Sequence, residues 1–137
     1  VSGRGRAKID CRLVPNQEPK KIRDCVQKHL IKHGFDDINV ELLFSSYPAK
    51  SDPEAEVVKA CIMASQRLYG EDAEINPFGS GSTPTWTIIK HLGIPLCSTG
   101  VGYITARTHS VNENIKIEHL IEGAKYMASI CEEFSKI

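Results

Sequence analysis

The sequence has no net charge and no long apolar run, and each absence excludes a class of protein. The 137 residues carry 17 basic and 17 acidic side chains, so the formal charge is zero. That balance argues against a general nucleic-acid or anionic-membrane binder, which depends on a basic field. No apolar run approaches the roughly 20 residues that span a bilayer, and no signal segment opens the chain. We therefore expect neither nucleic acid nor a membrane among its partners.

The cysteines also lack a pattern. Their number, 5, is odd, and no CxxC spacing occurs, which argues against a disulfide framework. The sequence instead predicts reduced core residues of a cytoplasmic protein at Cys11, Cys25, Cys61, Cys97 and Cys131. The chain begins at Val1 without a methionine and soon reaches a predicted strand, so we expect a piece of a longer protein.

The first 45 residues have the pattern strand, helix, strand. Apolar residues alternate over 7–14, which predicts a half-buried strand ended by Pro15. From Pro19 the spacing becomes helical, with Gly34 as the C-terminal cap. Alternation returns over 38–44. The serines and prolines of 45–53 then suggest a boundary between two domains.

The second part alternates helices with loops. Ser51 and Glu54 fit a capping box for a helix that runs to Gly70. The glycine-rich turn 79–84 opens a helix ended by Gly93, and 94–97 is a short apolar run typical of a buried strand.

A polar loop over 98–114 precedes the most regular helix of the chain. Its spacing predicts one apolar face that packs on the core, made of Leu120, Ala124, Met127, Cys131 and Phe134.

The glycine-rich turn and His109 are the main candidates for chemistry. A flexible backbone at a helix N-terminus can bind an anion, although Ser82 or Thr83 could simply cap the helix before Pro84. His109 lies in a polar loop after a predicted strand, where an imidazole can bind a metal or can simply be solvated.

Three further candidates each have an ordinary structural explanation. His29 and His33 have the i, i+4 spacing of zinc ligands, but no Glu lies between them as in HExxH, and they fit a helix stripe. Arg12 could bind a substrate carboxylate or form a cross-strand ion pair. Cys97 could be a thiol nucleophile or a small hydrophobe.

Five segments, in chain order, resemble the C-terminal portion of the co-catalytic zinc metallohydrolases. That family includes aminoacylase, carnosinase-like dipeptidases, glutamate carboxypeptidase, acetylornithine deacetylase and succinyl-diaminopimelate desuccinylase. The resemblance extends over nearly the whole chain, through Ile9–Gln17, Gly79–Pro84, Leu92–Pro95, Gly100–Gly102 and His109–Ile115.

The resemblance implies a role for several residues. His109 matches the family's final metal ligand, with Asn112 and Glu113 in a supporting role. Arg12 matches the arginine that binds the substrate carboxylate, and Gly81 and Ser82 match the turn beside the scissile bond. Val111 replaces a proline that is frequent in the family, which makes the loop less rigid.

The resemblance also implies an α/β fold in two parts. Residues 1–48 match the second half of a β-α-β-β-α-β lid domain that forms dimers, and residues 49–137 match the C-terminal part of an αβα catalytic domain. The complete enzyme is expected to use two zinc ions, or Co or Mn, to cleave the amide bond of a dipeptide or N-acyl amino acid with metal-activated water.

The family's other ligands and its general base have no match in this sequence. We therefore expect the 137-residue chain to be inactive alone. Two alternatives stay open: a non-catalytic α/β module that binds a small anion at the glycine-rich turn, and a thiol enzyme that uses Cys97.

Overall fold

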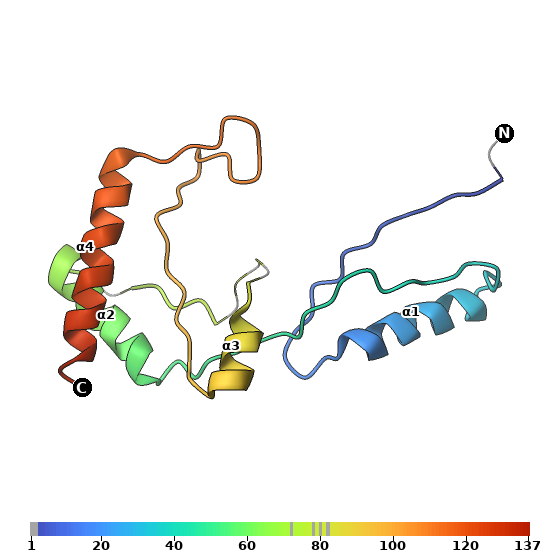
Figure 1. The fold of residues 1–137 in the computed structure, drawn as a ribbon, viewed down its shortest axis with the longest axis horizontal. Coiled ribbons are helices and arrows are strands. Elements are labelled where there is room, and N and C mark those ends of the chain that lie inside the picture. The colour runs from blue at the N-terminus through green and yellow to red at the C-terminus, as the bar shows by residue number, and fades with distance from the viewer. Residues whose placement is uncertain (1–2, 72, 78, 80, 82) are drawn as a thin grey trace. The chain divides into compact units, whose positions relative to one another are not determined.

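The computed structural model describes residues 3–71, 73–77, 79, 81 and 83–137, which divide into two compact units. One unit comprises residues 1–50 and 78–91, and the other comprises residues 51–77 and 92–137. The helices of the described residues are α1 (Pro19–Lys32), α2 (Glu56–Tyr69), α3 (Thr85–Leu92) and α4 (Ile117–Phe134) (Figure 1). Among them, no helix has the length and apolar character needed to cross a membrane.

Helix α1 begins and ends where its sequence predicts. Pro19 occupies the first helical position, where its missing N–H costs no hydrogen bond. After the helix, Gly34 adopts a φ of 82°, and its N–H donates to the Ile31 carbonyl at 3.1 Å. The Phe35 N–H reaches back to the Leu30 carbonyl at 3.0 Å. This pair of bonds is a Schellman motif, so the predicted glycine cap is confirmed.

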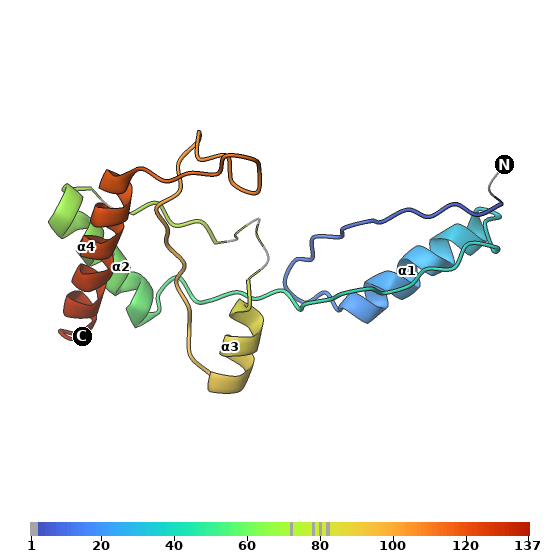
Figure 2. The same cartoon turned by 45° about the horizontal axis from the view of Figure 1, so that its top comes forward.

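The segment after α1 returns along the helix in an extended conformation (Figures 1 and 2). The side chain of Gln27 bonds to one edge of this segment. Its Nε2 donates to the Ile38 carbonyl at 2.9 Å, and its Oε1 accepts from the Val40 N–H at 2.9 Å. A side-chain amide therefore takes the two backbone groups that a neighbouring strand would bond in a sheet.

The predicted strands over 7–14, 38–44 and 94–97 are not observed: the described residues include no β-strand. The alternation of side chains still gives extended backbone, but a strand exists only where a neighbouring chain accepts and donates its ladder of hydrogen bonds. The alternating pattern therefore predicted extended backbone correctly, but its prediction of paired strands was wrong.

Aromatic stacking connects α3 to the residues before Ser51. The rings of Tyr47 and Trp86 stack with centroids 4.7 Å apart and an interplanar angle of 17°. The Lys90 ammonium lies 4.5 Å from the Trp86 ring centroid, a cation–π contact. The Tyr47–Trp86 contact therefore joins two stretches of the same unit, residues 1–50 and residues 78–91.

In the other unit, α2 packs against α4 (Figure 1). The core of this pair consists of small side chains, which allow the two helices to approach closely: Ala60, Cys61, Ala64 and Ile130. Cys97 and Tyr126 pack against this core, and the Tyr126 hydroxyl donates to the Cys61 carbonyl at 2.9 Å.

The start of α2 differs from the predicted capping box. Ala55 occupies the N-cap position without a side-chain cap, and the Asp52 carboxylate accepts from the Glu54 N–H at 2.9 Å. Ser51 Oγ instead accepts from the Leu96 N–H at 2.8 Å. The Ser51 hydroxyl therefore holds the 94–97 segment, which has no strand partner in the part of the chain that the structure describes. The predicted end of α2 is confirmed, because Gly70 has a left-handed φ of 72°.

Helix α4 buries a different face from the one that its apolar residues predict. The buried residues are Ser129, Ile130 and Glu133, whereas Leu120, Met127 and Phe134 are 55%, 53% and 47% exposed. Gly123, which lies on the inner side, contacts Val101 so closely that a Cβ there would lie 2.1 Å from Val101 Cγ1. Small residues on this face of α4 let α2 approach closely, and polar residues on the same face bond to an arginine of α2.

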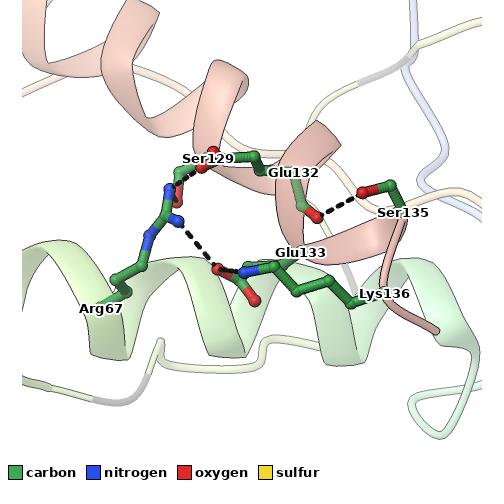
Figure 3. Close-up of polar contacts among 6 residues, drawn as sticks. All are labelled: Arg67, Ser129, Glu132, Glu133, Ser135 and Lys136. Carbon is green, nitrogen blue, oxygen red and sulfur yellow. Dashed lines mark hydrogen bonds and ion pairs between the residues drawn. The ribbon is translucent and has the colours of Figure 1, made fainter.

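That arginine, Arg67 of α2, connects the helices through a polar cluster (Figure 3). Its guanidinium donates to Ser129 Oγ at 2.9 Å and forms an ion pair with the Glu132 carboxylate. Glu133, only 5% exposed, lies 3.2 Å from Arg67 and 2.8 Å from the Lys136 ammonium. The buried carboxylate is therefore compensated by two cations.

All five cysteines are free, but the expectation that they are core residues was wrong for three of them. Cys61 is buried and Cys97 is half-buried, whereas Cys11, Cys25 and Cys131 are exposed. Cys131 follows the rotation of α4, which turns the predicted apolar face outward. Cys11 lies in an extended segment that has no covering layer among the described residues.

Candidate functional site

His109 occupies a tight loop whose backbone is unusual. Three residues other than glycine have left-handed φ angles there: 56° at Arg107, 62° at His109 and 61° at Asn112. Such angles are uncommon outside glycine and cost free energy unless surrounding contacts hold them. The Ser110 N–H donates to the Arg107 carbonyl at 2.9 Å, which closes the turn that carries the imidazole.

A second set of hydrogen bonds closes the base of the loop. The Asn114 N–H donates to the Ala106 carbonyl at 3.0 Å, and the Ala106 N–H donates to the Tyr103 carbonyl at 3.0 Å. The Asn114 side chain donates from Nδ2 to the Asn112 carbonyl at 2.9 Å and accepts from the Tyr103 hydroxyl. Ala106 is 5% exposed, so the base of the loop is anchored while its tip is open.

The Tyr103 ring is held from two sides. It lies edge-to-face with the His119 imidazole, with centroids 5.1 Å apart, and the Lys116 ammonium lies 5.1 Å from its centroid. His119 belongs to the first turns of α4, so this aromatic contact ties the loop to a helix. The sequence did not predict these contacts of Tyr103 and Asn114, although asparagine is known to hydrogen-bond nearby backbone groups in turns.

The described residues do not fit a two-zinc centre by themselves. Among them, no group of three or more His, Cys, Asp or Glu side chains lies close enough to hold a metal ion. His109 is exposed and is accompanied in its loop by Asn112 and Glu113, also exposed. This loop can therefore supply one imidazole ligand, and the remaining ligands of such a centre have to come from elsewhere.

The other predicted site residues belong to the unit that comprises residues 1–50 and 78–91. Arg12 lies in the extended segment before α1, with its Nε 3.3 Å from the Asp10 carboxylate. Both side chains are largely exposed, at 62% and 73%, so this ion pair contributes little stability. The ordinary explanation, an ion pair, is thus observed, with a partner on the same segment rather than across a sheet.

The glycine-rich turn has an open environment. Gly81 is exposed, and a Cβ built on it meets nothing within 4 Å. The Thr83 hydroxyl bonds to the Thr85 hydroxyl, and the first carbonyl acceptor of α3 is that of Pro84, at 3.2 Å from the Ile88 nitrogen. Ser82 lies outside the described residues, so its predicted substrate contact stays a prediction.

The remaining candidates keep their structural explanations. The rings of His29 and His33 lie 4.4 Å apart on the exposed side of α1, without a third ligand among the described residues. Cys97 packs against the apolar core that contains Cys61. Burial, followed by the interaction with Cys97, raises the pKa of Cys61 to about 12, which favours the neutral thiol. This environment does not favour a thiolate at Cys61.

Comparison with known proteins identifies the class to which this fold and loop belong. Residues 3–133 match the family model described as peptidase family M20/M25/M40. The chain therefore belongs to the M20 peptidase family.

A solved structure supports the same assignment. An M20 family metallo-carboxypeptidase from Sulfolobus solfataricus is 33% identical, with a TM-score of 0.77, over 92% of this chain and 29% of its own. This likeness is consistent with an α/β fold class for the segment.

Curated relatives agree with this assignment. An uncharacterised metallohydrolase of Methanocaldococcus jannaschii is 27% identical over 134 residues, which is 89% of this chain and 32% of the relative. The Cys-Gly metallodipeptidase of Candida albicans is 27% identical over 135 residues, 94% of this chain and 28% of its own. The Beta-Ala-His dipeptidase of Rattus norvegicus is 25% identical over 143 residues, 100% of this chain and 29% of its own. The chain spans about three tenths of the length of these relatives.

Proposed function

We propose that this chain is part of a zinc-dependent metallohydrolase that cleaves the amide bond of a dipeptide or an N-acyl amino acid. The observation that carries the proposal is the match of residues 3–133 to the M20 peptidase family. Relatives named as a Cys-Gly metallodipeptidase and a Beta-Ala-His dipeptidase support a small peptide as substrate. Cobalt or manganese could replace zinc in such a centre.

In this proposal His109 is one metal ligand of the complete enzyme. Its loop supports that role, because an exposed imidazole on an anchored turn can be held in one orientation while it reaches a metal bound mainly by other residues. Asn112 and Glu113 have a supporting role in the same loop. The 137-residue chain is inactive alone, because one imidazole does not make a two-metal centre.

We assign substrate binding to residues of the unit that comprises residues 1–50 and 78–91. Arg12 binds the substrate carboxylate through charge-assisted hydrogen bonds. Gly81 and Ser82 contact the substrate near the scissile bond. The open surroundings of Gly81 leave room for a ligand beside the backbone.

The architecture of the complete enzyme follows the same proposal. Residues 1–48 form the second half of a β-α-β-β-α-β lid, and residues 49–137 form the C-terminal part of the catalytic domain. The extended segments 7–14 and 38–44 pair with strands from outside this chain, and a homodimer forms through the lid. Five free cysteines support a reducing compartment such as the cytoplasm.

Kinetics of an Arg12→Ala variant test the proposed reaction in the complete enzyme. The variant is expected to lose about 1.5–3 kcal/mol in kcat/KM, the value of a hydrogen bond to a charged group, on substrates with a free carboxylate. Amides or esters of the same substrates are expected to lose much less. Lys8→Ala, on the same segment, is the matched control. An equal loss on blocked and free substrates would show that Arg12 is structural, and no hydrolysis of either class by the unaltered enzyme would reject the proposed function.

A further inference from the structure

The loop that carries His109 depends on a residue to which no metal-binding role has been assigned. Asn114 makes three bonds at the base of the loop: its backbone N–H to Ala106, its side-chain Nδ2 to Asn112, and its side-chain Oδ1 to the Tyr103 hydroxyl. One short side chain therefore joins the two ends of the loop.

These bonds act on backbone whose left-handed conformation is unfavourable for residues other than glycine. Asn112, whose carbonyl accepts from the Asn114 side chain, has a φ of 61°, and His109 three residues earlier has a φ of 62°. A left-handed residue other than glycine persists only when neighbouring groups over-determine its conformation. Val111, which has no ring to restrict its φ, lies between these positions and is 79% exposed, so it contributes neither rigidity nor packing.

Tyr103 transmits the position of α4 to Asn114. Its hydroxyl donates to Asn114, while its ring is fixed by His119 and Lys116. Contacts thus connect α4 to the Tyr103 ring, the Tyr103 hydroxyl to the Asn114 side chain, and that side chain to the turn that carries the His109 imidazole. Each step is a contact between residues of the same unit.

We propose that Asn114 and Tyr103 are positioning residues, which hold the 107–112 turn in its left-handed conformation and thereby orient the His109 imidazole. This inference rests on the proposed function only in taking a metal ion as the group that the His109 imidazole binds. The positioning itself is a property of this chain and is measurable without metal.

Nuclear magnetic resonance of the 137-residue chain tests the positioning. A residue with positive φ gives a strong intraresidue amide-to-α-proton NOE, which is expected for Arg107, His109 and Asn112. Tyr103→Phe keeps the ring and removes the hydroxyl. It is expected to weaken these three signals and to speed exchange of the Asn114 side-chain amide about fivefold, the effect of losing one neutral hydrogen bond. The resonances of α2 and α4 are expected to stay unchanged.

Two further variants separate positioning from general stability. Asn114→Asp keeps the acceptor for Tyr103 but removes the donor to Asn112, so it is expected to release Asn112 and to leave Tyr103 fixed. Asn114→Ala releases both. Tyr69→Phe, whose ring packs against Tyr126 outside the loop, is the matched control. Unchanged NOEs in Tyr103→Phe and Asn114→Ala would overturn the proposal.

The metal content of His109→Ala in the complete enzyme, taken with the behaviour of the turn, distinguishes a failure of this inference from a failure of the proposed function. If the turn loosens as expected but His109→Ala leaves the metal content of the complete enzyme unchanged, then the positioning is right and the metal-ligand role of His109 is wrong. If metal content falls in His109→Ala while the turn is insensitive to Asn114 and Tyr103, then the ligand is right and these residues do not position it.

Discussion

At the scale of single residues, the ionisable groups between α2 and α4 couple the stability of this helix pair to pH. Cys61 lies in the apolar core, where the thiolate would lose its hydration. Glu132 lies at the other extreme, as an exposed carboxylate paired with Arg67. Burial favours the neutral form of the first group, and a hydrogen-bonded cation favours the charged form of the second.

The reactivity of Cys61 follows from its raised pKa. Because the folded pKa lies at about 12, above the ordinary value of 9.0, the thiol stabilises the folded state below pH 9.0 and this contribution is lost as the pH rises towards 12. At about pH 8 we expect iodoacetamide to alkylate Cys61 far more slowly than the exposed Cys131, as measured by peptide mass spectrometry. Equal rates would contradict the buried position of Cys61.

Glu132 predicts the response to acid. The hydrogen bond from Arg67, and then its charge, lower the pKa of Glu132 below 4.5. Its contribution to stability is therefore present above pH 4.5 and is lost as the pH falls through the folded value. We expect the melting temperature to fall on acidification below pH 4.5, and Glu132→Gln to reduce this dependence. Glu71→Gln, at an exposed carboxylate, serves as the control. The same acid dependence in both variants would refute the assignment.

Part of the candidate site could be predicted from the order of residue types alone. The loop motif around His109 was recognisable because its residue types have a definite order. The role of Asn114 was not, because it depends on the Tyr103 hydroxyl eleven positions away along the chain. The Arg67 cluster was missed for the same reason: its partners lie 62 and 65 positions away.

At the scale of elements, the helices were predicted well and their packing was not. Pro19, Gly34 and Gly70 mark helix ends through local steric rules, which operate within one or two turns. The rotation of α4 is a tertiary property. Its inner face is chosen by the close approach of Val101 to Gly123 and by the reach of Arg67 to Ser129, rather than by the number of apolar residues.

A substitution at Gly123 tests this rotation. Alanine there would gain helix propensity of about 1 kcal/mol but would force Cβ against the stiff Val101 side chain. We expect Gly123→Ala to destabilise the chain by about 1–2 kcal/mol in denaturant unfolding, since overpacking outweighs the propensity. Adding Val101→Ala should relieve the clash and recover most of the loss relative to Val101→Ala alone. A higher stability for Gly123→Ala would mean that α4 turns another face to the 99–102 segment.

At the scale of the whole molecule, the described residues combine extended segments that form no β-strand with exposed apolar residues on α4. The chain belongs to the M20 family and spans about three tenths of the length of the relatives that it matches. Local pattern predicted which residues are extended, but it does not specify the neighbouring backbone with which a strand must pair. The same limit applies to the candidate site, because the described residues include no group of three or more His, Cys, Asp or Glu side chains that could hold a metal ion.

Metal analysis of a complete enzyme that contains this chain is the sharpest test of the proposal that His109 binds metal. We predict about two zinc ions per chain in the unaltered protein, as in co-catalytic centres, and a clearly lower content in His109→Ala. His29→Ala, a histidine on α1 without a metal-binding role in this account, should retain the full content. Full metal occupancy in His109→Ala would contradict the assignment of this loop to the metal centre.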